Sequence, residues 1–222
     1  MNKREWFKIA VDVLIVILIY GLVVYFDKDI VFFITGLRTP ALDSIFLGIT
    51  LLGSSITIFF IITSLLLWAS KKRFYIAPLW IILAIDAALN LTMKAIAQRN
   101  RPFQIFSLPQ IPILLQQAWS VTYDYSFPSF HAMMVFSTLP ILDKEFPRFK
   151  YLWITLAGMV AFSRIYFGLH YMSDVVFGCI LGYAIGWIIL NIYERDLHKK
   201  AKDYLKKRRE KKLMKKIKIK RK

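Results

Sequence analysis

The chain has 222 residues, of which 57% are hydrophobic, and it carries a formal net charge of +17. Soluble globular domains are closer to half apolar, so this composition excludes an ordinary soluble domain and indicates a single integral membrane domain. The one cysteine, Cys179, excludes a disulfide within the chain.

Six apolar segments are each predicted to cross a bilayer as an α-helix, which requires about 20 residues. In chain order they cover residues 9–26, 42–69, 74–93, 129–142, 151–168 and 171–193. The second segment is long enough to tilt, and the fourth is short. The first is not followed by a small-residue cleavage pattern, so we predict that it stays as an anchor. The predicted fold is therefore an all-α, six-transmembrane-helix bundle.

Clusters of Lys and Arg predict how this bundle is oriented. Basic residues fall in the loops before the first span, between the second and third, between the fourth and fifth, and after the sixth: Lys3, Arg4 and Lys8; Lys71, Lys72 and Arg73; Lys144, Arg148 and Lys150; and the C-terminal run. With six spans all four clusters lie on one side. Basic short loops remain cytoplasmic, so both termini are predicted to be cytoplasmic.

The C-terminal segment 195–222 holds 16 Lys and Arg residues against 3 Asp and Glu residues. It follows an apolar segment directly, and basic clusters beside a membrane are attracted to anionic lipid headgroups. We therefore divide the chain into a membrane domain, residues 1–194, and a basic cytoplasmic tail, residues 195–222. The predicted partner of the tail is the anionic lipid surface, and no nucleic acid is expected.

The outer loop, about residues 97–128, is rich in proline and aromatic residues. Proline interrupts regular helix, and aromatic side chains suit the interface between membrane and water. We predict a short interfacial helix around residues 113–119.

Seven polar residues are predicted to lie near the outer ends of four spans. They are Lys94, Arg101, Ser129, His131, Arg164, His170 and Asp174. Ionisable groups at a membrane are costly, so such a cluster indicates a functional site. Guanidinium and ammonium groups bind phosphate oxygens, and the helix start at Pro128 and Ser129 adds free backbone N–H groups. The set predicts a phosphate site.

The spacing of His170 and Asp174 places them on one face of a helix. A carboxylate at one imidazole nitrogen leaves the other free as a nucleophile. His131, from another helix, is then the candidate acid for the leaving group and later the base for water. Because the cations supply the stabilising charge, no cofactor or metal is expected. A metal site built from His131, His170 and Asp174 is the alternative, which the neighbouring cations disfavour.

Three stretches resemble the signature of the type-2 phosphatidic acid phosphatase superfamily, the integral-membrane lipid phosphate phosphatases. Residues 94–102 match Lys-x6-Arg-Pro in full, and residues 163–174 match Ser-Arg-x5-His-x3-Asp in full. Residues 128–131 match Pro-Ser-Gly-His except that Phe130 replaces the glycine. The superfamily also contains soluble vanadium haloperoxidases, which six spans argue against.

The resemblance implies a role for each matched residue. His170 would be the nucleophile, Asp174 its orienting carboxylate and His131 the general acid. The phosphate would be held by Lys94, Arg101, Ser129 and Arg164. Phe130 puts in doubt how closely a backbone N–H approaches the phosphate.

The implied reaction is hydrolysis, on the extracytoplasmic side, of the phosphate or diphosphate of a membrane lipid through a phosphohistidine. The substrate would be a polyprenyl diphosphate, phosphatidylglycerol phosphate or phosphatidic acid. Two alternatives stay open: a lipid phosphotransferase with the same intermediate, and a lipid-phosphate binding or transport protein without turnover.

Asp86 and Asn90 precede Lys94 by two turns and one turn on the same predicted helix face. They form either a polar stripe beneath the site or an interhelical hydrogen bond that fixes packing. We favour the hydrogen bond.

Overall fold

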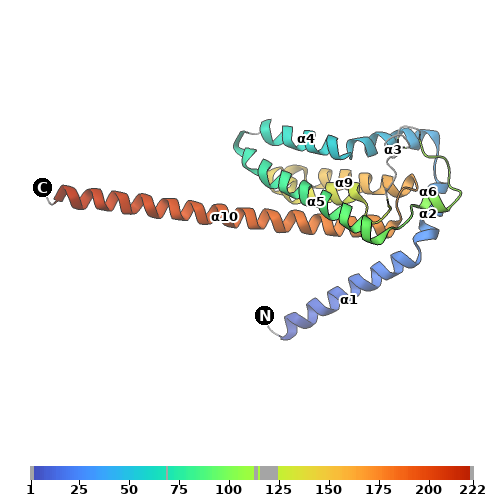
Figure 1. Ribbon diagram of the computed structural model, residues 1–222, viewed down its shortest axis with the longest axis horizontal. Coiled ribbons are helices and arrows are strands. Elements are labelled where there is room, and N and C mark those ends of the chain that lie inside the picture. Colours follow the sequence, from blue (N-terminus) through green and yellow to red (C-terminus); the bar gives the residue numbers. More distant parts are fainter. Residues whose placement is uncertain (1–2, 69, 113–114, 116–124, 221–222) are drawn as a thin grey trace.

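The computed structural model describes residues 3–68, 70–112, 115 and 125–220. Within these residues the chain is helical and contains no strand, which confirms the all-α prediction. The helices in Figure 1 are α1 (Lys3–Tyr25), α2 (Asp27–Gly36), α3 (Pro40–Leu52), α4 (Ser55–Trp68), α5 (Ile76–Ala97), α6 (Pro102–Ile105), α8 (Phe130–Glu145), α9 (Lys150–Tyr166) and α10 (Met172–Lys220). Two 3-10 segments, Ser70–Tyr75 and Pro147–Phe149, precede α5 and α9.

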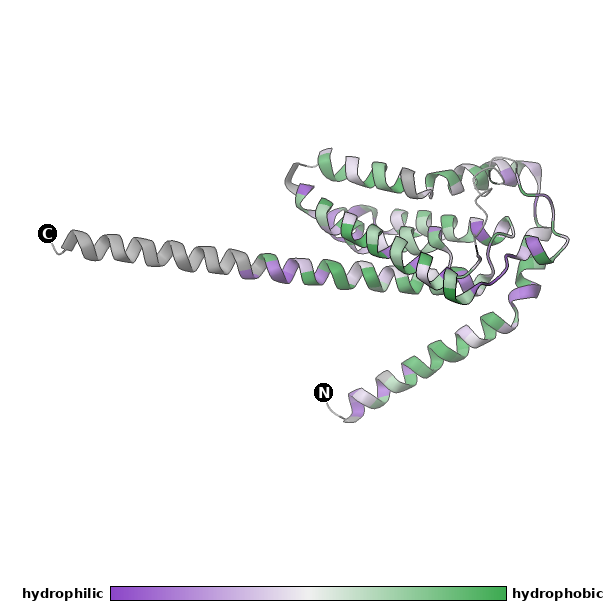
Figure 2. Cartoon of the chain, in the orientation of Figure 1, coloured by the Kyte–Doolittle hydropathy of each residue, from purple (hydrophilic) through white to green (hydrophobic). Residues whose placement is uncertain are grey.

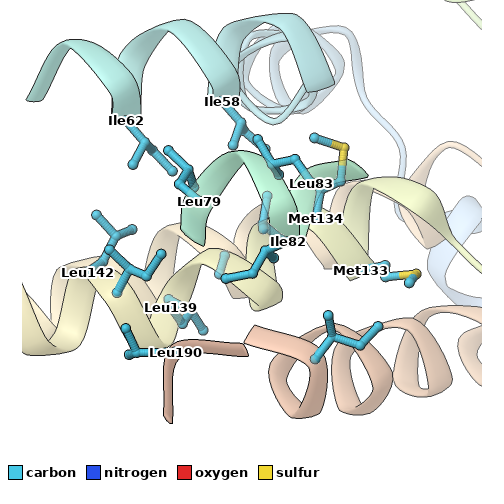
Figure 3. Close-up of a cluster of buried hydrophobic side chains, with 14 of the residues drawn as sticks. Ile58, Ile62, Leu79, Ile82, Leu83, Met133, Met134, Leu139, Leu142 and Leu190 are labelled. Atoms are coloured by element: carbon cyan, nitrogen blue, oxygen red, sulfur yellow. The ribbon is translucent and has the colours of Figure 1, made fainter. Parts of the chain in front are cut away.

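Helix α8 is the centre of the bundle, since it contacts α4, α5, α9 and α10. Its apolar side chains pack with those of its neighbours in one buried cluster (Figure 3). Ile62 of α4, Ile82 of α5, Met133 of α8 and Leu190 of α10 all belong to this cluster. Burial of such side chains is worth about 1.5–3 kcal/mol each in water, and inside a bilayer close packing takes over this role.

Helices α8 and α10 approach each other closely along a face of α10 on which three glycines follow one another at every fourth position. A Cβ added at Gly182 would lie 2.1 Å from the Met133 carbonyl oxygen, and one at Gly186 would lie 2.0 Å from the Ser137 carbonyl oxygen. At Gly178 the nearest atom is the Ser129 carbonyl oxygen, at 2.8 Å. Only glycine allows two helices to approach so closely, as in other membrane helix pairs.

Three helices in the described part of the chain are long and apolar enough to cross a membrane: Arg4–Tyr25, Arg73–Ile105 and Met172–Leu197. A fourth is added if Asp27–Gly36 and Pro40–Leu52, bent by 118°, are taken as one broken span. Figure 2 shows that hydrophobic residues dominate α1 and the first half of α10. The six-span count stays a prediction, because α8 and α9 have only 16 and 17 residues.

The predicted second span, residues 42–69, is wrong as a single helix. Helix α3 ends at Leu52 and α4 begins at Ser55, with Gly53 and Ser54 between them. Gly53 packs against Val160 so tightly that a Cβ there would lie 2.3 Å from a Val160 methyl group. The break therefore coincides with the contact between α3 and α9.

Helix α2 was not predicted, and α10 continues past the proposed domain boundary at residue 194 without interruption. In Figure 1 the C-terminal part of α10 and the N-terminal part of α1 both extend away from the bundle. The predicted interfacial helix at residues 113–119 lies outside the described residues except for Leu115.

Arg38, between α2 and α3, joins this corner of the bundle to the outer loop. Its guanidinium donates to both carboxylate oxygens of Asp43, at 3.1 and 2.7 Å, and to the carbonyl oxygens of Pro109 and Gln110, at 3.0 and 2.8 Å. Tyr166 Oη donates to the same carboxylate at 2.8 Å. The segment before residue 111 is thus held against the ends of α3 and α9.

Replacing Arg38 with glutamine is expected to lower the free energy of unfolding by about 1–2 kcal/mol, because it removes charge-assisted hydrogen bonds that are partly shielded from water. Thermal melting in detergent measures this change. Arg148→Gln, the same substitution at an exposed position, is the control and should melt with the unaltered protein. Equal melting of both variants would contradict a stabilising role for Arg38.

Candidate active site

The seven predicted site residues come together at one end of the bundle. Lys94 lies in the last turn of α5, Arg164 in the last turn of α9, and Asp174 in the first turn of α10. Ser129 caps α8, His131 lies in the first turn of that helix, and Arg101 and His170 lie in the connecting segments. Arg164, His170, Arg101 and Lys94 all lie near enough to His131 for their charges to act on it.

Most of this cluster is withdrawn from solvent. Arg101, Ser129, Arg164, His170 and Asp174 are each at most 2% exposed, whereas His131 is half-buried. Cations held in such surroundings interact strongly with an anion that enters, because little water screens them. His131 is therefore the more accessible of the two imidazoles.

Two hydrogen-bond partners define the tautomer of His170. Its Nδ1 lies 2.7 Å from the Ser126 carbonyl oxygen, which can only accept, so Nδ1 carries the proton. Its Nε2 lies 3.1 Å from Nη1 of Arg101, which can only donate, so Nε2 presents a lone pair. A neutral imidazole in this tautomer has its nucleophilic nitrogen beside a guanidinium.

Asp174 acts on His170 from a greater distance than the sequence suggested. Its Oδ2 lies 3.8 Å from His170 Nδ1, too long for a hydrogen bond but close enough for electrostatic attraction. The same oxygen accepts hydrogen bonds from Tyr171 N, at 2.9 Å, and from Ser126 Oγ. The carboxylate thus holds Ser126, whose carbonyl group orients the imidazole.

The start of α8 is positioned by its neighbours. Asn90 of α5 donates to the Pro128 carbonyl oxygen at 3.1 Å, and Ser129 N donates to the Asp174 carbonyl oxygen at 3.1 Å. Among the described residues the buried Ser129 Oγ has no hydrogen-bond partner, so it retains its capacity to bind an anion. Phe130, which stands where glycine was expected, packs against the apolar core cluster.

Below the site, the interhelical hydrogen bond predicted for Asp86 is confirmed. Ser137 Oγ of α8 donates to the Asp86 carboxylate of α5, and both side chains are fully buried. Asp86 therefore ties α5 to α8 below the site.

Four residues of the site region were missed by the sequence analysis: Asp27, Arg99, Ser126 and Ser173. Arg99 lies two residues before Arg101, at the same predicted membrane end, and its charge alone could have marked it. Its guanidinium contacts Asp174 and Asp27 at 2.7 and 2.9 Å.

Comparisons with known proteins identify the family of the chain. Residues 74–197 match the family model of the PAP2 superfamily. An undecaprenyl-diphosphatase of Sulfolobus acidocaldarius is 31% identical over 148 residues, which is 65% of this chain and 68% of that protein. Phosphatidylglycerophosphatase B of Bacillus subtilis is 26% identical over 176 residues, which is 72% of this chain and 79% of that protein.

A solved structure shares the fold. The crystal structure of a transmembrane PAP2 type phosphatidylglycerolphosphate phosphatase from Bacillus subtilis superposes with a TM-score of 0.63 at 23% identity, over 83% of this chain and 96% of that one. The family match covers more than half of the chain, including every predicted site residue. The chain therefore belongs to the PAP2 superfamily.

Proposed function

We propose that this protein hydrolyses the phosphate or diphosphate of a membrane lipid through a phosphohistidine at His170. The chain belongs to the PAP2 superfamily, and its relatives named as an undecaprenyl-diphosphatase and a phosphatidylglycerophosphatase support a lipid phosphate phosphatase, a hydrolase. The observation that carries the mechanism is the tautomer of His170, whose Nε2 lone pair lies among buried cations.

In the first step, Nε2 of His170 attacks phosphorus, an N–P bond forms and the P–O bond to the leaving group breaks. Lys94, Arg101, Ser129 and Arg164 hold the phosphoryl oxygens and stabilise the charge that develops on them. The bound phosphate offsets the positive charge of the neighbouring cations and so allows His131 to hold a proton. His131 then gives this proton to the leaving oxygen, which belongs to a lipid alcohol or a lipid phosphate.

In the second step, a water molecule attacks the phosphohistidine and transfers a proton to His131. The N–P bond breaks, its electron pair returns to Nε2, and inorganic phosphate leaves. The Asp174 carboxylate, 3.8 Å from the ring, favours the positively charged imidazole of the intermediate. Both histidines are then restored.

We propose that the site lies on the extracytoplasmic side of a six-span protein. The basis is the distribution of Lys and Arg, which puts both termini and the basic tail, residues 195–222, in the cytoplasm. The tail would contact anionic headgroups there. A substrate would keep its apolar tail in the outer leaflet and extend its headgroup to the helix ends.

The names of the relatives reduce the number of candidate substrates. One is an undecaprenyl-diphosphatase and another is a phosphatidylglycerophosphatase, so we propose a polyprenyl diphosphate or phosphatidylglycerol phosphate as substrate. Both present a terminal phosphate group on an amphiphile that cannot leave the membrane. This group is joined through a phosphoanhydride in the diphosphate and through an ester in phosphatidylglycerol phosphate, and in both its negative charge suits buried cations beside a bilayer.

The test is phosphate release by purified protein from polyprenyl diphosphate, phosphatidylglycerol phosphate and phosphatidic acid in mixed micelles. We expect turnover of at least one of the first two, with inorganic phosphate as product. Radiolabel appearing in a second lipid would instead identify a phosphotransferase. Inactivity on all three lipids would contradict the proposed substrate class.

A further inference from the structure

Asp27 is a buried acid that none of the motifs includes. It is the first residue of α2, separated from the end of α1 by Phe26 alone, and it is 4% exposed. Its Oδ1 accepts a hydrogen bond from Ser173 N at 2.9 Å, and its Oδ2 accepts one from Ser173 Oγ. Ser173 N is in the first turn of α10, where backbone N–H groups lack partners within the helix. Asp27 therefore caps α10 from a distant part of the chain and adds negative charge at the positive end of that helix.

Arg99 connects this cap to the catalytic carboxylate. Its Nη2 donates to Asp27 Oδ2 at 2.9 Å, and its Nη1 donates to Asp174 Oδ1 at 2.7 Å and to Ser173 Oγ at 2.8 Å. Its guanidinium carbon lies 3.8 Å from the centre of the Tyr171 ring. A planar guanidinium can bridge two carboxylates in this way, whereas a lysine offers a single nitrogen.

The contacts form a continuous path to the imidazole. Arg99 and Ser126 occupy the two oxygens of the Asp174 carboxylate, and the Ser126 carbonyl oxygen accepts the proton of His170 Nδ1. Ser126 N also donates to the Arg99 carbonyl oxygen at 2.7 Å. The position of Arg99 thus affects both the carboxylate and the carbonyl group that orient His170.

From these contacts we infer that Asp27 is a positioning residue for His170, acting through Arg99, Ser173 and Asp174. This inference rests on the proposed function of His170 as nucleophile. The contacts of Asp27 described above run to Ser173 and Arg99, so we expect its removal to affect the attacking nitrogen more than substrate binding. The α1–α2 junction thereby becomes part of the catalytic apparatus.

The first experiment compares Asp27→Asn with Asp29→Asn in the purified full-length protein. Asp29 lies on the same helix two residues later and is exposed, so the two variants carry the same chemical change. We expect Asp27→Asn to lower kcat by about 10- to 100-fold, as outer-shell substitutions do, while KM stays within about threefold. Asp29→Asn should match the unaltered protein. A kcat within about twofold of the unaltered value for Asp27→Asn would overturn the inference.

A second variant tests the same path in case Asp27→Asn folds poorly. Ser173→Ala removes the hydroxyl between Asp27 and Arg99 but keeps the backbone N–H that Asp27 accepts. We expect a smaller loss in kcat, about 3- to 10-fold, again with KM unchanged. An unchanged kcat in Ser173→Ala, or a loss expressed only in KM, would count against a positioning role.

Coupling through Arg99 gives a further criterion. If Asp27 acts through Arg99, the double variant Asp27→Asn/Arg99→Gln should lose about as much in kcat as the worse single variant. If the fold-losses in kcat of the two single variants multiplied in the double variant, the two residues would act independently. That result would overturn the inference that Asp27 acts through Arg99.

A readout independent of turnover separates this inference from the proposed function. Selective ¹⁵N labelling of histidine reports the tautomer of His170, with His170→Ala supplying the assignment. We expect the Nδ1-protonated form in the unaltered protein and a mixture of tautomers in Asp27→Asn. An unchanged tautomer in Asp27→Asn would overturn the inference even if kcat falls. If the unaltered protein released no phosphate from any lipid, the proposed function would fail while the tautomer would still decide the role of Asp27.

Discussion

Substituting His170 with alanine is expected to lower lipid phosphatase turnover by at least about 10³-fold, because the attacking nitrogen is removed and no phosphohistidine can form. Affinity for a non-hydrolysable lipid phosphonate should remain within about tenfold, since Lys94, Arg101 and Arg164 still provide positive charge. Phosphate release and equilibrium binding, measured on the same preparation, separate the two effects. A protein that only binds or transports lipid phosphates would keep its function in this variant.

The matched control is His198→Ala, which changes the one histidine of the basic tail and should keep full turnover. A second check is the acid stability of a phosphoryl label on the protein. When a reaction with labelled substrate is quenched rapidly, the unaltered protein should carry an acid-labile phosphoryl group that His170→Ala lacks. If His170→Ala retained labelling, another residue would have to be the nucleophile.

Substituting Gly182 with alanine is the second change from which we expect a large effect. The added Cβ would lie 2.1 Å from the Met133 carbonyl oxygen, whereas real contacts of this kind are not shorter than 3.0 Å, so α8 and α10 must separate by about 1 Å. Helix α8 carries Ser129 and His131, and α10 carries Asp174. A displacement of this size between catalytic groups costs about 10²-fold in rate, and overpacking costs about 1–3 kcal/mol in stability.

Gly158→Ala provides the comparison, because nothing lies within 4 Å of a Cβ added there in the middle of α9. Alanine is the better helix former by about 1 kcal/mol, so this variant should be at least as stable as the unaltered protein and fully active. Thermal melting and phosphate release, measured on both variants, test whether the close contact at Gly182 is required for stability and turnover. Equal behaviour of Gly182→Ala and Gly158→Ala would mean that the contact between α8 and α10 is not required.

The candidate residues whose clustering could be predicted from the sequence are those in short local patterns. His170 and Asp174 are four residues apart, and Lys94 and Arg101 stand at the end of an apolar run, so hydropathy and helix geometry suffice to place them. The all-helical architecture follows from the same long apolar segments. The spacing of these residues along the chain and their position at the ends of apolar segments together predict where they lie.

What the sequence could not predict depends on contacts between distant residues. Asp27 meets Ser173 across 146 positions, and no local pattern records such a pairing. The break at Gly53 and Ser54 occupies two residues inside an apolar run, which a hydropathy window averages away. Gly182 and Gly186 read as ordinary apolar helix until the backbone of α8 is seen against them. Ser126 was missed because its carbonyl group, not its side chain, orients the imidazole.

This last contact has a consequence for mutational scanning. The acceptor that selects the reactive nitrogen of His170 belongs to the main chain at Ser126 and survives every side-chain replacement there. Alanine at this position deletes only the hydroxyl that reaches Asp174. A scan of point substitutions would therefore report at position 126 only the lost bond to Asp174 and the fit of a fully buried side chain. The acceptor itself would go untested, because only an insertion or deletion of one residue beside it shifts the peptide unit and silences the enzyme.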